Sequence, residues 1–282
     1  MNAVPLADAR DEGAFGGKAV QLGAAIRAGL PVPDGFALSA DLVAALARGD
    51  RAARATLDEV GDRLAGPFAV RSSAVGEDSA AASFAGQHAT VLNAHGVADT
   101  AQAVAAVWRS ATSESALAYR RRVGALGPVR MGVVVQRLVA ADVAGVLFTR
   151  NPITGADELV IEASWGLGEV VVQGLVVPDL YRVARTGEVI ERRSGVKTVA
   201  MRRLTSGGTR TESVDPGLVA RLCLADSHLR ALSQVALRCA DVFGQGPHDI
   251  EWAFDADAPY LLQRRPITAT KQHPCRQESR RS

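Results

Sequence analysis

Residues 248–266 have the sequence HDIEWAFDADAPYLLQRRP. Apolar and polar residues alternate along two runs, 248–254 and 260–265, as is typical of β-strands. A short turn near residues 256–258 joins the two runs, so we predict an antiparallel hairpin. This hairpin is the clearest sheet element in the second half of the chain.

One face of this hairpin is polar. Alternate residues of a strand share a face, so Asp249 and Glu251 point the same way. On the second strand Leu261, Gln263 and Arg265 are expected to share a face. Antiparallel pairing then sets Glu251 roughly opposite Gln263 and Asp249 roughly opposite Arg265. Two carboxylates, an amide oxygen and a guanidinium converge in this arrangement.

The chemistry of these groups suits a metal ion and a phosphate. Mg²⁺ prefers hard oxygen ligands, commonly one or two carboxylates, while it shares phosphate oxygens with a substrate. An adjacent Arg can stabilise the charge on a phosphoryl group in transit. The alternative is a solvated face with a surface Asp–Arg pair, because alternating polar faces are common in half-exposed strands. The pattern of the hairpin alone leaves both interpretations open.

A second candidate phosphate contact lies near the N-terminus. The segment Phe15-Gly-Gly-Lys18 places one of the rare lysines after paired glycines and before a predicted helix. Backbone N–H groups at a helix N-terminus, with a Lys nearby, favour a phosphate. The segment is not a Walker A loop, because Glu12 stands where the first Gly belongs and Ala19 replaces Ser or Thr. An ordinary glycine turn with a solvated lysine is the alternative.

Further polar groups follow predicted strands. Arg71 and the two serines after it end a strand predicted over residues 67–71, where they can hold phosphate oxygens or simply form a cap with a surface Arg. The sequence GLGE at 166–169 fails the dinucleotide-binding pattern, because Val171 stands where the third Gly belongs. Glu162 lies at the end of another predicted strand and could contact a ribose or a metal. The alternative is that it is an ordinary surface charge.

Composition excludes several classes of protein. The 282 residues carry a net charge of +2, with 48% apolar and 22% charged residues. These values are ordinary for a globular protein, and the length fits about two domains or one bilobal domain. No bulk charge points to nucleic acid or to an anionic membrane surface. The apolar region 131–148 is interrupted by polar residues and indicates buried strands instead of a membrane span.

The cysteines and histidines give no metal or disulfide pattern. Cys223, Cys239 and Cys275 are too few and too scattered for a disulfide framework or a zinc site, which fits a reducing cytoplasm. The N-terminus has no basic segment followed by an apolar stretch, so we expect no signal peptide and a cytoplasmic protein. No histidine spacing suggests a metal pair, and no Gly-x-Ser-x-Gly motif is present.

Periodicity predicts a mixed α/β chain with a large sheet in its second half. An apolar stripe with steps of four and three residues indicates a helix over 218–243, with Cys239 in the core. The small, polar segment 72–87 is expected to be a mobile functional loop, and the polar tail 271–282 to be disordered. The other predicted elements are helices within 16–30 and 98–122 and strands at 129–138, 143–149, 159–162, 180–183 and 188–192.

Several segments together resemble one protein family. They are GGKAVQLGAAIRAGLPVPDGF at 16–36, FAVRSSAVGEDSAAASFAGQHATVLN at 68–93, MGVVVQRLVAADVAGVLFTRNPITG at 131–155, EASWGLGEVVVQGLVVPDLY at 162–181, HDIEWAF at 248–254 and YLLQRRPIT at 260–268. The chain resembles the ATP-binding domain of phosphoenolpyruvate synthase, pyruvate phosphate dikinase and the rifampicin phosphotransferases. The resemblance covers nearly all of residues 13–268, in order.

The resemblance implies an ATP-grasp fold of class α/β (α+β), in which two lobes clamp ATP. The lobes would be residues 1–137, with the phosphate-binding Lys and Arg and the mobile loop, and residues 138–270, with the metal-binding hairpin. The loop 76–87 would fold over the nucleotide.

Roles follow from the resemblance, position by position. Arg265 would contact the transferred phosphoryl group, while Lys18 and Arg71 would hold phosphates, and these three would be the catalytic residues. Adenine would contact Gln136, Arg137, Leu138 and Val139, and Glu162 would lie near the ribose or the adenine. Mg²⁺ would be organised by Asp249, Glu251 and Gln263. The nucleotide would also contact Gln263 and Arg265.

The family's modular organisation shapes the functional expectation. Longer members also have a swivelling domain with a phosphorylatable His and a separate acceptor domain, and their reaction typically leaves AMP. This chain ends soon after Arg265, without a segment like the glycine-rich, His-centred one, and its stretch between 36 and 68 looks short. We therefore expect the ATP-binding, phosphoryl-donating subunit of a split enzyme, with the carrier His and acceptor site on a partner chain.

Two alternatives stay open. In one, the chain is a self-sufficient small-molecule kinase whose acceptor enters the cleft directly, since phosphoryl transfer needs mostly positioning and charge stabilisation. In the other, it is a nucleotide-binding module without turnover. A retained transfer residue, Arg265, argues against this second alternative.

Overall fold

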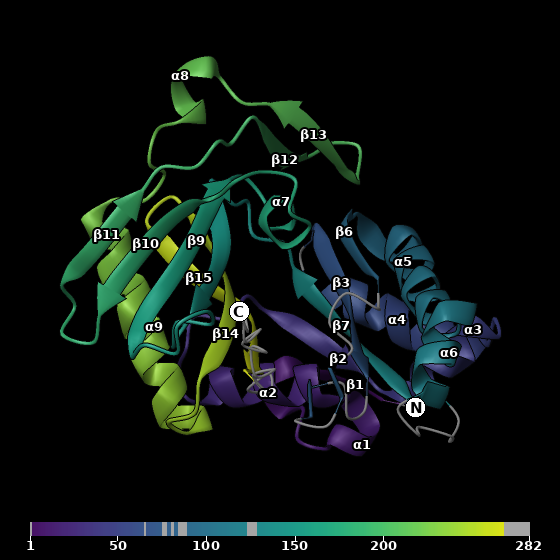
Figure 1. The fold of residues 1–282 in the computed structure, drawn as a ribbon. Coiled ribbons are helices and arrows are strands. Elements are labelled where there is room, and N and C mark those ends of the chain that lie inside the picture. The colour runs from purple at the N-terminus through teal and green to yellow at the C-terminus, as the bar shows by residue number, and fades with distance from the viewer. Residues whose placement is uncertain are drawn as a thin grey trace, which may run out of the picture.

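Two antiparallel sheets form the framework of the molecule (Figure 1), five strands in the first and six in the second. A computed structural model describes residues 2–64, 66–74, 78–79, 82–83, 89–122 and 129–267. All strands of the first sheet precede Leu138, and all strands of the second follow it. The predicted two-lobed α/β fold is confirmed. The lobe limits 1–137 and 138–270 stay a prediction, and the tail 271–282, with Cys275, lies outside the described residues.

The first sheet carries helices and a core of its own. Its strands, in spatial order, are β1 (Ala3–Pro5), β2 (Gly35–Leu38), β7 (Met131–Arg137), β3 (Phe68–Ala74) and β6 (Thr90–Ala94). Apolar side chains of β7 and β3 pack with those of the helices in one buried cluster, because alternate strand residues face the helices. The helices on this side are α3 (Ala40–Ala47), α4 (Arg51–Arg63) and α5 (Gly96–Ala111), followed by α6 (Glu114–Arg122).

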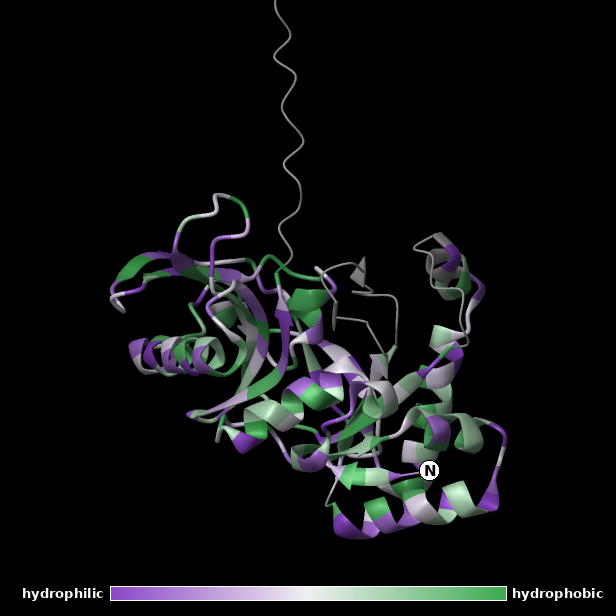
Figure 2. Ribbon diagram, turned by 90° about the horizontal axis from the view of Figure 1, so that it is seen from below, coloured by the Kyte–Doolittle hydropathy of each residue, from purple (hydrophilic) through white to green (hydrophobic). Residues whose placement is uncertain are grey.

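The second sheet has the order β11-β10-β9-β8-β14-β15 and is covered by one long helix, α9 (Asp226–Phe243). Leu229, Leu232 and Cys239 of α9 are buried in the same cluster as Trp252 and Phe254 of β14. Figure 2 shows hydrophobic residues on the sheets and hydrophilic residues on the outer turns of the helices. The strands are β8 (Val143–Phe148), β9 (Glu158–Trp165), β10 (Asp179–Ala184), β11 (Val189–Arg193), β14 (His248–Asp255) and β15 (Ala258–Pro266).

Helix α2 (Gly17–Arg27) joins the two halves. Leu22 and Ala25 are buried in one cluster with Val134 of β7 and with Trp252 and Leu261 of the second sheet. The helix therefore covers the face of the first sheet that the other helices leave open. Two short elements precede it, the 3₁₀-helix η1 (Leu6–Asp8) and α1 (Glu12–Phe15).

A small hairpin, β12 (Val199–Arg203) and β13 (Thr209–Ser213), stands outside both sheets. Its base is fixed to the second sheet by Lys197, whose ammonium is fully buried and bonded to the carboxylate of Asp179. Asp179 also accepts hydrogen bonds from the backbone N–H groups of Gly195 and Cys223, each at 2.8 Å. Two short helices lie before and after the hairpin in the sequence, α7 (Glu169–Val172) and α8 (Pro216–Val219).

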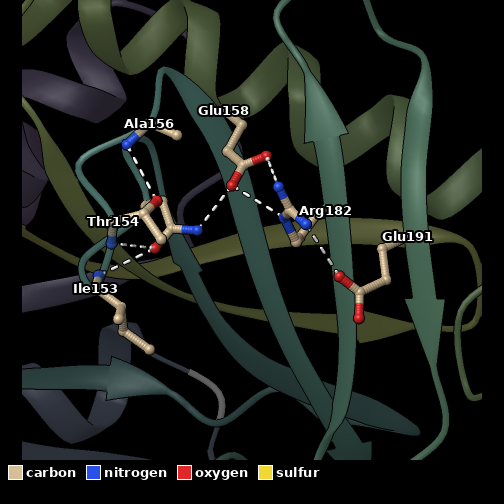
Figure 3. A network of polar contacts seen from close by, with 7 residues as sticks. Ile153, Thr154, Ala156, Glu158, Arg182 and Glu191 are labelled. Carbon is tan, nitrogen blue, oxygen red and sulfur yellow. Dashed lines mark hydrogen bonds and ion pairs between the residues drawn. The ribbon is translucent and has the colours of Figure 1, made fainter.

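The loop between β8 and β9 is held by a polar network (Figure 3). The Asn151 side chain accepts from the backbone N–H groups of Ile153 and Thr154 and donates to Glu158 Oε1 at 2.7 Å. Two 2.9 Å hydrogen bonds join Arg182 to the Glu158 carboxylate. The hydrogen bond from Arg182, and then that from Asn151, lower the pKa of Glu158 although burial opposes the shift.

Several predicted boundaries were wrong. The predicted helix over 218–243 is interrupted after α8, and α9 begins only at Asp226. The segment 98–122 forms two helices, α5 and α6, separated at Thr112 and Ser113. Of the predicted loop 72–87, residues 72–74 belong to β3. The two-residue strands β4 (Asp78–Ser79) and β5 (Ala82–Ser83) pair with each other, and the rest of this loop lies outside the described residues.

The helices of the described ranges include none that is long and apolar enough to cross a membrane.

Candidate functional site

The Glu251 carboxylate is the centre of a cluster of charges between the two sheets. Oε1 accepts from Arg265 Nη2 at 2.7 Å, and Oε2 accepts from Arg71 Nη1 at 3.3 Å. Burial raises the pKa of Glu251, but the charges of Arg71, Arg265 and Lys18 and the hydrogen bond from Arg265 outweigh it, so the pKa is lowered. Glu251 is therefore an anion held among cations from both sheets and from α2.

The register of the last hairpin confirms the predicted convergence. Glu251 lies opposite Gln263, and Asp249 lies opposite Arg265. One detail was wrong: Leu261 does not share their face but packs in the core opposite Trp252. The register shifts between Glu251 and Trp252, and this bulge reverses the alternation.

Lys18 is positioned by close contact between α2 and the end of β3. It lies in the first turn of α2 with 7% of its surface exposed. Ser73 Oγ accepts from the Ala19 backbone N–H at 3.0 Å. Gly16 before the helix has φ +78°, and a Cβ there would lie 1.8 Å from the Ser73 carbonyl oxygen. Only glycine lets the two segments approach this closely.

Arg71 approaches Glu251 from the first sheet. It lies within β3 and is 6% exposed. Its Nε is buried without a hydrogen-bond partner among the described residues. A buried guanidinium with spare donor capacity is suited to a phosphate oxygen.

A pocket opens beside this cluster, and both Arg71 and Glu251 line it. It contains about 500 Å³ of empty space, part of it open to solvent. Its walls include residues 136–139, which lead from the end of β7 toward the second sheet. Their contact with adenine stays a prediction. Gln136 is fixed by a 3.2 Å hydrogen bond from Nε2 to the Pro33 carbonyl. The apolar part of the lining consists mainly of Ala69, Leu92, Leu138, Val139, Ala141, Ala144, Leu167 and Ala253.

The remaining predicted residues lie in two different places. Lys18, Asp249, Gln263 and Arg265 do not line the pocket but group around Glu251 at its edge. Glu162 is on β9 opposite Val146 and does not line the pocket. Burial raises the pKa of Glu162.

Sequence reasoning missed Glu169. This residue begins α7 and lines the pocket. Burial raises its pKa, the charge of Arg71 lowers it, and the charge of Glu251 raises it again, with a net increase. The signal was present in the sequence GLGE, where a carboxylate follows two glycines. The segment fails the dinucleotide pattern, and within the resembling stretch 162–181 Glu169 was given no role.

The donor set fits Mg²⁺ that arrives with a nucleotide. Within the part of the chain that the structure describes, no three His, Cys, Asp or Glu side chains form a metal cage. Mg²⁺ does not need such a cage, because it commonly uses one or two carboxylates and completes its shell with phosphate oxygens and water. Asp249, Glu251 and Gln263 supply such oxygens.

The sequence of the chain is similar to those of known proteins. The model of the family described as "Pyruvate phosphate dikinase, AMP/ATP-binding domain" matches residues 40–282. A protein of Methanothermobacter thermautotrophicus named "Probable phosphoenolpyruvate synthase" is 43% identical over 202 residues, covering 71% of this chain and 29% of that protein. A rifampicin phosphotransferase of Streptomyces sp. is 40% identical over 241 residues, covering 84% of this chain and 26% of that protein. The chain thus spans less than a third of the length of either relative.

Among solved structures, D-alanine–D-alanine ligase from Bacillus anthracis is similar to this chain, with 9% sequence identity and a TM-score of 0.37. The match covers 89% of this chain and 55% of the ligase chain. Because this TM-score is low, the assignment to a family rests on the sequence matches alone. The family model covers most of the sequence, and each of the two relatives is at least 40% identical over more than two thirds of it. The chain therefore belongs to the family of the pyruvate phosphate dikinase AMP/ATP-binding domain.

Proposed function

We propose that the chain binds ATP with Mg²⁺ between its two sheets and donates a phosphoryl group to a carrier His or an acceptor on a partner chain. The observation that carries the proposal is the Glu251 cluster. It joins Arg71 of the first sheet to Arg265 of the second at the edge of one pocket.

The two ends of the pocket suit the two ends of ATP. The apolar wall and residues 136–139 suit adenine, because a flat base fits between small aliphatic side chains and the backbone of a strand end. Lys18, Arg71 and Arg265 supply positive charge for the phosphates at the other end. The polar ends of Asp249, Glu251 and Gln263 would hold Mg²⁺ between them and the phosphate oxygens.

Charge stabilisation is the main requirement for the transfer itself. Bound Mg²⁺ would neutralise charge that develops on the phosphoryl oxygens. Arg265 would give up part of its contact with Glu251 and direct its guanidinium N–H groups to the phosphoryl group. Arg71 and Lys18 would hold the remaining phosphates in line.

The histidines of the described ranges lie away from the pocket. His95, His228 and His248 are those within the described ranges, and none of them lines the pocket. His248 is buried, donates from Nε2 to the Gly244 carbonyl at 2.9 Å and accepts from Arg264 Nη2 at 2.6 Å on Nδ1. Under the proposed function, the phosphoryl group would pass to a carrier His or an acceptor on a partner chain.

The testing experiment combines ATP binding with analysis of nucleotide products. The purified chain is titrated with ATP and Mg²⁺ by calorimetry, then incubated with both, and ATP, ADP and AMP are separated. We expect ATP to bind and to survive until a partner is supplied. Formation of ADP by the chain alone would favour a self-sufficient kinase, and absence of ATP binding would overturn the proposal.

Arg265→Ala separates binding from transfer. We expect this variant to bind ATP within about tenfold of wild type but to lose the turnover that wild type shows once an acceptor is supplied, because the contact of Arg265 to the phosphoryl group forms mainly in transit. Arg193→Ala is the matched control, since the Arg193 side chain is 69% exposed on β11. Equal losses of binding and turnover in Arg265→Ala would contradict the assigned role.

A further inference from the structure

Asn93 occupies an unusual place at the end of β6. Its side chain is buried, with 1% of its surface exposed. Its φ of +62° lies in the left-handed region, which Asn adopts more readily than most other non-glycine residues.

The Asn93 side chain connects the first sheet to the β12–β13 hairpin. Nδ2 donates to the carbonyl oxygens of Leu204 and Gly208, at 2.7 and 2.5 Å. The Asn93 carbonyl accepts from the Gly208 backbone N–H at 3.0 Å. His95 Nε2 lies 3.1 Å from Asn93 Oδ1, which fixes the orientation of the amide. The hairpin turn is thus bound to the first sheet, while its base is bound to the second by Lys197.

This contact is narrow. One hollow, between the turn and α5, is lined by Asn93, Asp99 and Gly208. A second hollow on another side of the hairpin is lined by Met201 and residues 140–142. The hairpin reaches the first sheet through the Asn93 hydrogen bonds instead of a broad packed surface, so a single side chain can control the connection.

The two ends of the connection are walls of the nucleotide pocket. Leu92, the neighbour of Asn93, lines the pocket from the first sheet. From the second half of the chain, Leu167 lines it, and the Leu167 backbone N–H donates to the Met201 carbonyl of β12 at 3.0 Å. Met201 itself packs against the apolar cluster of the pocket. The hairpin therefore spans from one wall to the other (Figure 1).

We propose that Asn93 is a positioning residue that latches the β12–β13 hairpin to the first sheet and so sets the closure of the pocket over the nucleotide. This role rests on the proposed ATP-binding function. Nucleotide exchange requires the two walls to separate, and separation at this edge breaks the hydrogen bonds of Asn93. Loss of the latch speeds nucleotide release without altering the groups around Glu251.

Asn93→Gly is the decisive variant. It removes the side-chain hydrogen bonds, while glycine accepts a φ of +62° without strain, so the fold is retained. The matched control is Ala256→Gly, at the turn between β14 and β15, where a non-glycine residue also has positive φ, +50°, and no latch is lost. Thermal unfolding of both variants checks that stability is retained.

Hydrogen exchange without nucleotide tests the latch by itself. We expect residues 204–208 to exchange faster in Asn93→Gly than in wild type and in Ala256→Gly. Unchanged exchange would overturn the latch, whatever the chain binds.

Displacement kinetics then test the effect on the pocket. A fluorescent ATP analogue is chased with ATP in the presence of Mg²⁺. One neutral hydrogen bond corresponds to a factor of roughly five, and the variant loses the two that Nδ2 donates. We therefore expect release to be about 25-fold faster from Asn93→Gly and unchanged from Ala256→Gly. Faster exchange with unchanged release would overturn the positioning role but leave the proposed function intact. Failure of wild type to bind the analogue or ATP would contradict both.

Discussion

Glu251 shows how a buried charge is made tolerable at the scale of one residue. Burial of a carboxylate without partners is costly. Glu251 avoids this cost because it contacts two guanidinium groups and is stabilised by the charge of a third cation, Lys18. The same groups that stabilise Glu251 are those that phosphates would recruit. Under the proposed function, ATP and Mg²⁺ would replace contacts that these groups make with one another.

The role of Glu251 predicts a change in metal dependence. In Glu251→Gln one anionic oxygen ligand is lost, so we expect the Mg²⁺ concentration for half-maximal ATP binding to rise about tenfold or more. Calorimetric titration of ATP at several Mg²⁺ concentrations measures this shift. Glu59→Gln, at an exposed position of α4, is the control. An unchanged Mg²⁺ requirement in Glu251→Gln would remove Glu251 from the ligand set.

Lys18 predicts discrimination between nucleotides. Lys18→Met keeps the buried stem but removes the charge, so we expect ATP to bind more weakly by about tenfold while AMP is little affected. Competition titrations with ATP and AMP measure the difference. Equal weakening of the two nucleotides would show that Lys18 does not contact the distal phosphates.

At the scale of elements, regular alternation could be predicted and irregularities could not. Alternation in 248–266 predicted the pairing of Glu251 with Gln263, because one period fixes both faces of a strand. It missed the bulge that turns Leu261 into the core, since a bulge depends on neighbouring strands. It also missed β12–β13, whose residues are mostly half-buried or exposed and carry little apolar periodicity.

The site was predicted in part for the same reason. Residues around Glu251 lie on regular strands or beside glycines that mark a close approach, as Gly16 does against Ser73. Glu169 and Asn93 depend on contacts between segments far apart in the sequence, such as Asn93 with Gly208. A periodic pattern within one segment carries no information about such contacts.

The buried Asp179–Lys197 pair predicts a large stability effect at the base of the hairpin. Lys197→Met leaves the Asp179 carboxylate buried without its cation, and we expect a loss of about 3–5 kcal/mol in the free energy of unfolding. Urea unfolding of the chain measures it. The double variant Asp179→Asn with Lys197→Met should recover much of the loss, because no buried charge remains; a double variant as unstable as Lys197→Met would contradict this account.

At the scale of the whole molecule, the Glu158 network predicts acid sensitivity. The pKa of Glu158 is below its ordinary value in the folded state, chiefly through Arg182, so its contribution to stability is present above that ordinary value. The contribution is lost as pH falls from about 4.5 through the folded pKa. We expect the free energy of unfolding to fall less steeply with acidification in Glu158→Gln than in wild type.

Urea unfolding at a series of pH values between about 3 and 7 measures that slope. Glu188→Gln, an exposed position between β10 and β11, is the control and should keep the wild-type slope. A wild-type slope in Glu158→Gln would show that the network in Figure 3 does not contribute to acid sensitivity.

The position of α2 has a consequence for how the chain is made. Leu22 and Ala25 of this early helix share a cluster with Trp252 and Leu261, which are synthesised more than two hundred residues later. Domains generally fold as they emerge from the ribosome, N-terminal parts first. The first sheet can assemble early, but one side of α2 stays exposed until the last hairpin is released. Until then this apolar surface is available to a chaperone.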